Sequence, residues 1–455
     1  MTMSLESMLE HTQAREAVVG AAGLGLTLER IRTRQITVGV IGLGYVGLPL
    51  SLVFAEAGVK TVGFDIDESK IRAIANKKSY FRHISDERLD GPVGKKMFSA
   101  TARFERVAEC DALIICVPTP LTHHLEPDLR YIRETCEAIA PYLRPHTLVS
   151  LESTTWPGTT VEIVQPILER LGNVKVGRDL YLCFSPERED PGNPSYGTRT
   201  IPKLVGGVDK KSLELAHALY ALAITEVVPL SSTQVAESAK LFENIFRCVN
   251  IALVNELKVI FDKMGIDVWE VIKAAETKPF GFMPFWPGPG LGGHCIPIDP
   301  FYLTWKAKES GVSTRFIELA GEINRSMPKW VIEKVQDCLN TFSKPVRGSR
   351  ILILGLAYKP NIDDLRESPS LELITLLEQK GAIVDYHDPL IPEIPRTREH
   401  ADLAGRKSHE PSAKYDCFIL ATDHKCFSPE KFLAVGVPIV DTRNMLPKHK
   451  LVFAA

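Results

Sequence analysis

The segment from Ile36 to Gly47 constrains the fold of this chain more than any other. Its first six residues are β-branched apart from one glycine, which is typical of a strand buried inside a parallel sheet. A turn with the pattern Gly-x-Gly-x-x-Gly follows, and a helical pattern then runs from Leu48 to Glu56. Such a glycine pattern alone is a weak signal. A strand, this turn and a helix in this order predict a nucleotide-binding βαβ unit.

Each glycine of the turn has its own physical task. Gly42 permits the tight turn, Gly44 lets the backbone approach a pyrophosphate, and Gly47 allows close packing of helix on strand. Asp65 comes 18 residues after Gly47, where a carboxylate accepts hydrogen bonds from a ribose 2′-OH and disfavours a 2′-phosphate. We therefore expect NAD rather than its phosphorylated form. The residues expected to contact it are Gly42, Gly44, Tyr45, Val46, Gly47, Asp65, Lys70, Pro118 and Thr119.

The alternation of strands and helices occurs in two parts of the chain. Further strands of the first part are predicted at 61–64, 112–117, 147–152 and 181–184. Strands of the second part are predicted at 350–355, 382–386, 416–421 and 438–440. We expect the α/β class, with two Rossmann-like doubly wound domains joined by a long central helix and a helical middle domain. The predicted boundaries are a lead-in at 1–35, a first sheet domain at 36–230, a helical middle at 231–340 and a second sheet domain at 341–455.

The long central helix is predicted from Gln234 to Met264, a stretch without glycine or proline. Apolar residues cover most of its circumference, so we expect it to be buried in the core or against another subunit. Four polar residues share one stripe at i, i+3, i+4 and i+7, namely Lys240, Glu243, Asn244 and Arg247. Such a stripe is usually solvated, but this helix has little solvated face. Lys240 and Asn244 are therefore candidates to orient a water or stabilise an alkoxide.

Cys295 differs from the other cysteines in its surroundings. The nine cysteines include no CxxC pair, and several, such as Cys417, lie in apolar strand patterns typical of core residues. Cys295 lies in the loop 290–300, where glycines leave the backbone open to a ligand. A thiol there can attack an aldehyde to give a thiohemiacetal, whose oxidation gives a thioester. A structural cysteine is the alternative, and the neighbouring His294 and Asp299 favour the nucleophile.

Three more segments follow predicted strands, where ligands of such sheets bind. The first two are residues 152–155 and the carboxylate-rich stretch 185–192, and turn chemistry alone is the alternative for both. The third, residues 358–368 in the second sheet, contains Lys359 and Arg366, which suit phosphates.

Composition limits the partners. A net charge of −2 over 455 residues gives no basic footprint for nucleic acid. No apolar run reaches the ~20 residues that span a bilayer, and single cysteines fit a reducing compartment. We expect a cytoplasmic protein without a nucleic-acid partner, a membrane span or a metal site.

Together these motifs resemble the UDP-glucose/GDP-mannose dehydrogenase family over residues 36–446. The most specific segment is GGHCIPIDP with Cys295 and Asp299, supported by AKLFEN, ESTTWPGTT and KPNIDDLRESP. The resemblance implies an N-terminal NAD-binding domain, a central helical dimerisation domain carrying the catalytic cysteine loop, and a C-terminal UDP-binding domain. It also implies a homodimer or higher homo-oligomer. The implied reaction is a four-electron oxidation of a UDP-sugar at the C6 alcohol, through an aldehyde and a thioester on Cys295.

The resemblance further implies roles for single residues. Lys240, Asn244 and Asp299 would support the oxyanion and the water. Thr154 would hold that water, and Glu187 would assist thioester hydrolysis. The implied substrate contacts are Arg188, Gly292, Gly293, Lys359 and Arg366.

Residues 187–193 and 280–289 are similar to the branch of the family that oxidises UDP-N-acetylhexosamines. This favours UDP-N-acetylglucosamine, with UDP-N-acetylmannosamine or UDP-glucose as alternatives, and a product used for a surface polysaccharide. The second carboxylate of UDP-glucose enzymes falls here on Pro191, and nothing transfers its role to Glu189 or Asp190. More distant alternatives are a β-hydroxyacid-type dehydrogenase, which needs no cysteine, and a non-catalytic nucleotide-sugar sensor.

Overall fold

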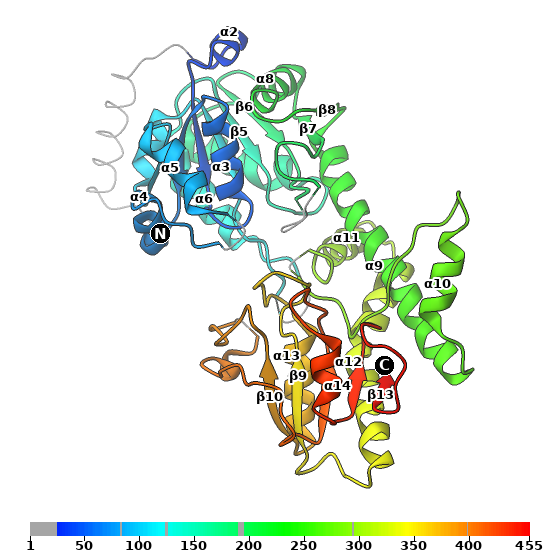
Figure 1. Cartoon of the computed structure of the whole chain (residues 1–455). Coiled ribbons are helices and arrows are strands. Elements are labelled where there is room, and N and C mark those ends of the chain that lie inside the picture. Colours follow the sequence, from blue (N-terminus) through cyan, green and yellow to red (C-terminus); the bar gives the residue numbers. More distant parts are fainter. Residues whose placement is uncertain (1–24, 82–83, 123–125, 190–194, 294, 398) are drawn as a thin grey trace, which may run out of the picture. The chain divides into compact units, whose positions relative to one another are not determined.

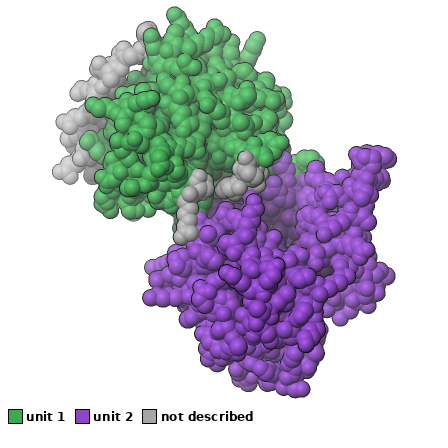
Figure 2. Space-filling model, in the orientation of Figure 1, with its two compact units in different colours: residues 1–242 green, residues 243–455 purple. Residues whose placement is uncertain are grey.

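The computed structural model of the chain describes residues 25–81, 84–122, 126–189, 195–293, 295–397 and 399–455 (Figure 1). The chain divides into two compact units, residues 1–242 and 243–455 (Figure 2). Each unit contains one sheet, so the predicted pair of α/β domains is confirmed. Most of the predicted lead-in, His294 and residues 190–194 lie outside the described residues. The finer division into four segments stays a prediction.

The first unit contains an eight-stranded sheet with the order β3-β2-β1-β4-β5-β6-β7-β8. Its strands are β1 (Thr37–Ile41), β2 (Lys60–Phe64), β3 (Phe98–Thr101), β4 (Ala112–Ile115), β5 (Thr147–Leu151), β6 (Leu180–Phe184), β7 (Lys203–Gly207) and β8 (Val227–Leu230). Its helices are α2 (Leu28–Arg32), α3 (Gly47–Glu56), α4 (Glu68–Ala75), α5 (Asp86–Gly94), α6 (Arg130–Ile139), α7 (Gln165–Gly172) and α8 (Lys210–Tyr220). Shorter turns are η1 (Phe104–Glu109), η2 (Ala140–Tyr142) and η3 (Thr160–Val164). One core cluster packs α3 and α8 against β1, β4, β5, β6 and β7.

The strands β7 and β8 run opposite to the other six strands of this sheet, whereas the sequence predicts a parallel sheet. β7 pairs antiparallel with β6, at Cys183↔Gly207 and Phe184↔Gly206, and β8 pairs parallel with β7. The sequence pattern predicts neither strand, because β7 ends in two glycines and β8 contains a proline. Since β7 runs in the opposite direction, its first residue, Lys203, lies at the edge of the sheet where β5 and β6 end.

The helix α9 (Thr233–Lys263) agrees with the predicted long helix and continues across the boundary between the units. Its apolar residues are of two kinds. Cys248 and Ala252 are buried, whereas Phe246, Leu253 and Ile260 are exposed. Nowhere in the described part of the chain is a helix both long and apolar enough to cross a membrane.

The second unit contains a parallel sheet with the order β10-β9-β11-β12-β13. Its strands are β9 (Arg350–Leu354), β10 (Ile383–His387), β11 (Cys417–Leu420), β12 (Ile439–Asp441) and β13 (Val452–Ala454). Its other elements are α10 (Val268–Glu276), α11 (Asp299–Glu309), α12 (Arg315–Thr341), α13 (Pro369–Gln379), η4 (Ala401–Leu403) and α14 (Pro429–Ala434).

Both faces of this second sheet are covered. Side chains alternate along a strand, so Ile351 and Ile353 of β9 pack with α12 and α13, whereas Leu352 and Leu354 pack with α14. A strand buried on both faces reads as a continuous apolar run, which explains why β9 could be predicted from sequence.

Gly355, directly after β9, has φ +84°, and an added Cβ would lie 2.5 Å from the carbonyl oxygen of Thr422. Gly436 has a similar φ of +79° but no heavy atom of the described chain within 4 Å of such a Cβ. We expect Gly436→Ala to lower the free energy of unfolding by about 1–2 kcal/mol, from the left-handed backbone alone. Gly355→Ala should lose about 1–3 kcal/mol more, from the backbone clash. Equal losses in urea unfolding would contradict this packing.

Candidate functional site

The turn after β1 has the geometry of a dinucleotide site. Gly42 has φ +90°, and an added Cβ would lie 2.6 Å from the carbonyl oxygen of Cys116. A Cβ on Gly47, the first residue of α3, would lie 1.8 Å from the Gly42 oxygen. At Gly44, by contrast, no heavy atom of the described residues lies within 4 Å of an added Cβ. The backbone at Gly44 is therefore open to a ligand, beside a helix N-terminus that attracts phosphate.

Asp65 closes this turn from the end of β2. Its Oδ2 accepts a hydrogen bond from the Leu43 amide at 2.9 Å and lies 2.8 Å from the Lys70 Nζ. The structure thus places Asp65 against the turn, with Lys70 of α4 paired to it, and both are predicted cofactor contacts. Of the other predicted contacts, Tyr45 and Val46 directly precede α3. Pro118 and Thr119 follow β4, which pairs with β1, so they lie at the same edge of the sheet.

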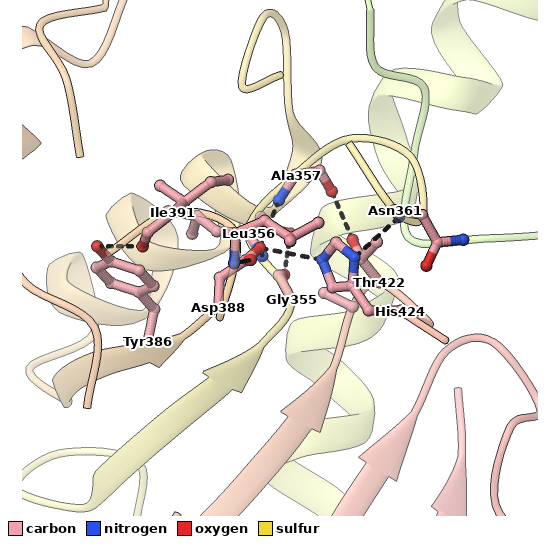
Figure 3. A network of polar contacts seen from close by, with 12 residues as sticks. Gly355, Leu356, Ala357, Asn361, Tyr386, Asp388, Ile391, Thr422 and His424 are labelled. Atoms are coloured by element: carbon pink, nitrogen blue, oxygen red, sulfur yellow. Dashed lines mark hydrogen bonds and ion pairs between the residues drawn. The ribbon is translucent and has the colours of Figure 1, made fainter. Parts of the chain in front are cut away.

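The turn after β9 in the second unit is similar but closed (Figure 3). Oδ2 of Asp388, which follows β10, accepts hydrogen bonds from the amides of Leu356 and Ala357 at 2.7 and 3.2 Å. It also lies 3.1 Å from the Nε2 of His424. Burial would raise the pKa of Asp388, but the bonds from His424 and the amides outweigh it and lower the pKa. Ala357, fully buried, stands where the first turn has Gly44. Of the two turns, the first therefore has the geometry that admits a pyrophosphate.

Cys295 lies four residues before α11, in the second unit. All nine cysteines are described, and Cys295 and Cys426 are the exposed ones. The carbonyl of Cys295 accepts the amide hydrogen of Asp299 at 2.8 Å. The Asp299 side chain is 1% exposed, and its Oδ2 accepts a hydrogen bond of 2.6 Å from the amide group of Asn244. The structure therefore brings three predicted catalytic residues together, with Asn244 and Asp299 held in a buried pair.

The Cys295 loop packs against the segment that follows β9. The amide of Gly293 donates a hydrogen bond to the carbonyl of Arg366 at 2.8 Å. An added Cβ on Gly292 would lie 2.4 Å from the Cβ of Tyr358, so this contact needs a glycine. The structure thus brings together Gly292, Gly293 and Arg366, three residues whose contact with substrate stays a prediction.

The basic residues predicted to contact substrate have different surroundings. Arg366 forms an ion pair with Asp364, with 2.6 Å between NH2 and Oδ2, and remains 40% exposed. Lys359 is half-buried in the same segment. Arg188 belongs to the first unit, where its NH1 donates to the carbonyl of Pro202 at 2.7 Å.

A cluster of charges lies at the strand ends of the first unit. Glu152 follows β5, Glu187 follows β6, and Lys203 begins β7. The Lys203 Nζ lies 2.7 Å from Oε2 of Glu152 and 3.8 Å from Oε2 of Glu187. Thr154, half-buried, is two residues beyond Glu152. Lys203 is the residue of this cluster that the sequence does not predict. The sequence around it predicts no strand, so nothing places it beside Glu152 and Glu187.

Glu189 adds a second carboxylate near Glu187. Its amide donates a hydrogen bond to Oε1 of Glu187, and its own Oε1 accepts the amide hydrogen of Thr198 at 3.1 Å. Burial, reinforced by the charge of Glu187, raises the pKa of Glu189 to about 7. Burial also raises the pKa of Glu152, against the opposing effect of Lys203. These groups form a partly desolvated acid–base cluster.

The four residues of the predicted polar stripe on α9 differ in how deeply they are buried. Lys240 and Asn244 are 7% and 5% exposed, whereas Glu243 is half-buried and Arg247 is exposed. Burial of the first two favours a functional stripe over a solvated one.

The chain matches three sequence profiles of one family, described as the UDP-glucose/GDP-mannose dehydrogenase family. The NAD binding domain matches residues 36–224, the central domain residues 234–326, and the UDP binding domain residues 352–448.

Curated relatives and solved structures of similar length also match. A UDP-N-acetyl-D-glucosamine 6-dehydrogenase of Pseudomonas aeruginosa is 35% identical over 386 residues, covering 84% of this chain and 89% of that protein. An NDP-N-acetyl-D-galactosaminuronic acid dehydrogenase of Ralstonia solanacearum is 34% identical over 418 residues, covering 90% and 96%. The structure of a UDP-D-ManNAc dehydrogenase from Pyrococcus horikoshii has a TM-score of 0.82 and 32% identity, and the match covers 91% of this chain and 97% of that one.

The open space at Gly44 yields a binding prediction. Gly44→Ala places a methyl group where the pyrophosphate approaches, so we expect the Kd for NAD⁺ to rise about tenfold or more, which corresponds to about 1.4 kcal/mol. The Tm should not fall, because nothing described in the chain is displaced. Gly91→Ala, also in open space but on α5, is the matched control and should bind NAD⁺ normally. An unchanged Kd in calorimetry for Gly44→Ala would contradict this site.

Proposed function

The chain belongs to the UDP-glucose/GDP-mannose dehydrogenase family, and we propose that it oxidises the C6 alcohol of UDP-N-acetylglucosamine to the uronic acid. The family makes it an NAD-dependent UDP-sugar dehydrogenase, with the cofactor bound by the N-terminal domain. The observation that carries the proposal is the exposed thiol of Cys295 beside the buried pair of Asn244 and Asp299. That arrangement supports covalent capture of an aldehyde next to groups able to polarise it.

NAD⁺ supplies the hydride acceptor when bound at the turn of Gly42 to Gly47. The chain's own groups perform the remaining chemistry. The C6 carbon first gives up a hydride and its hydroxyl a proton to solvent, which leaves an aldehyde. The sulfur of Cys295 then bonds to the carbonyl carbon, and the thiol proton passes to the oxygen. The thiohemiacetal carbon gives up a second hydride and its hydroxyl a second proton to solvent, which leaves a thioester. Water then adds to the thioester carbonyl and passes a proton to Glu187. The C–S bond breaks, Cys295 leaves as a thiolate, and the acid is released.

Other residues hold these reactants in place. Lys240 and Asn244 donate to the oxyanion that forms at the reacting carbon. Asp299 fixes the Asn244 amide through their 2.6 Å hydrogen bond, and Thr154 holds the attacking water. In the second unit, Gly292, Gly293, Lys359 and Arg366 contact the substrate, and Arg188 does so from the first. Arg366 would have to exchange its present ion pair with Asp364 for phosphate oxygens.

The choice of sugar rests on the N-acetylhexosamine names of the relatives and on the segments near Glu187 and Phe280. UDP-N-acetylmannosamine and UDP-glucose are the alternatives. The cytoplasmic location and the use of the product in a surface polysaccharide stay predictions.

We also propose that the chain forms a homodimer through α9. Phe246, Leu253 and Ile260 are seven residues apart and are 44%, 50% and 45% exposed. Seven residues are close to two helical turns, so the three side chains form one apolar stripe. An exposed apolar stripe of this length supports contact with a second helix.

The substrate proposal is tested by incubating the enzyme with UDP-N-acetylglucosamine, UDP-N-acetylmannosamine and UDP-glucose while absorbance at 340 nm is followed. We expect the highest kcat/KM for the first, with about two NADH formed per sugar because both oxidations occur on one substrate. Much faster turnover of UDP-glucose would contradict the substrate, and about one NADH would contradict the thioester.

Cys295→Ala is the control for that assay and should form no uronic acid. Full activity of this variant would instead indicate chemistry of the β-hydroxyacid type. Cofactor binding without turnover of any sugar would indicate a sensor.

For the dimer, we expect Leu253→Asp to convert a dimer into a monomer at micromolar concentration, because a buried unpaired charge opposes association. Leu171→Asp is the matched control, since Leu171 is 40% exposed on another helix, α7 of the first unit. Sedimentation or light scattering measures the oligomeric state. A monomeric wild type, or a dimeric Leu253→Asp variant, would refute the interface.

A further inference from the structure

Lys203 is a buried cation that the proposed mechanism does not use. Its side chain is 7% exposed, although lysine is among the residues least often buried. It begins β7, which runs antiparallel to β6, and this reversal brings a lysine to the edge where β5 and β6 end. The same edge carries Glu152 and Glu187.

The contacts of Lys203 are anchored on one side. Its Nζ lies 2.7 Å from Oε2 of Glu152, whose Oε1 accepts a 2.7 Å hydrogen bond from the hydroxyl of Tyr220. That hydroxyl is in turn 2.8 Å from Oγ of Ser150. Both oxygens of Glu152 are thus held by buried partners, so the position of the ammonium is fixed. Burial would lower the pKa of Lys203, but Glu152 and then Glu187 raise it above its ordinary value, which keeps the cation charged.

The side chain of Glu187 is more exposed than that of Glu152 and lies farther from the Lys203 ammonium. Its Oε2 lies 3.8 Å from the Lys203 Nζ, and its Oε1 accepts the amide hydrogen of Glu189. Its side chain is 15% exposed, against 0% for Glu152. Glu187, Glu189, Thr198 and Lys203 line one small cavity. Of the two carboxylates beside Lys203, Glu187 is therefore the one that a water can reach.

We propose that Lys203 is a positioning residue for Glu187, which it holds in place through an ammonium anchored on Glu152. The inference rests on the proposed function, in which Glu187 accepts a proton from the water that attacks the thioester. That step balances: one proton of the water passes to Glu187, the hydroxyl joins the acyl carbon, and the thiolate leaves. A general base must lie within hydrogen-bond reach of the proton that it takes, and a fixed ammonium on one side of Glu187 limits where its carboxylate can lie.

The competing explanation is that Lys203 and Glu152 form an ion pair that only stabilises the fold. Lys203→Met alone does not separate the two, because it leaves Glu152 buried without its cation. The double variant Lys203→Met/Glu152→Gln removes both charges and keeps an acceptor for Tyr220. We expect its Tm to return close to that of the wild type and its Kd for the UDP-sugar to stay unchanged, whereas KM should fall with the rate of hydrolysis.

We expect kcat of this double variant to fall about 10- to 100-fold, the range for a misplaced catalytic group. A burst of two NADH per active site should precede slow turnover, and intact mass should show an acyl adduct that is absent from Cys295→Ala. Lys211→Met/Glu214→Gln removes an exposed ion pair of the same unit and should leave all readouts unchanged.

Lys203→Arg is a second test of the inference, for use if the double variant is unstable, because it keeps a buried cation beside Glu152. A planar guanidinium does not replace a compact ammonium between two carboxylates, so the adduct should accumulate here too. Wild-type rates of hydrolysis in both variants would overturn the inference while the proposed function stands. A wild type that forms no NADH from any UDP-sugar would overturn both.

Discussion

In each unit, an aspartate after the second strand of the βαβ unit accepts the amide hydrogen of the turn after the first. Asp65 binds the Leu43 amide at 2.9 Å, and Asp388 binds the Leu356 amide at 2.7 Å. A buried amide without a partner would cost free energy, and the carboxylate removes that cost while joining two strand ends. This bond fixes the position of the turn in each unit.

The two turns differ in what lies beyond that shared bond. At Gly44 there is open space in front of a helix N-terminus, whereas the second turn has a buried alanine and an aspartate paired with His424. One scaffold therefore gives two different surroundings, which agrees with separate NAD- and UDP-binding domains. The two turns thus differ in side-chain volume and in which of their backbone amides donate hydrogen bonds to groups of the protein itself.

The sequence predicts those parts of the molecule that depend on local pattern. The strands before Gly42 and Gly355, and the long helix α9, follow from apolar periodicity and are confirmed within a few residues. The strand β7 escapes prediction because it ends in two glycines, and its reversed direction depends on long-range pairing. Because β7 is not predicted, Lys203 is not predicted to lie in the site either. The Asn244–Asp299 bond joins residues 55 positions apart, so sequence names both partners without showing that they meet.

The uneven burial of the cysteines has a chemical consequence. Burial raises the pKa of the Cys110, Cys136 and Cys183 thiols to about 12, so these groups stay protonated at neutral pH. A protonated, buried thiol reacts slowly with peroxide or alkylating reagents, because the thiolate is the reactive form and must be reached. Oxidative damage is therefore directed to the exposed thiols, Cys295 and Cys426. Under the proposed function, in which Cys295 is the nucleophile, oxidants remove activity before they disturb the buried core.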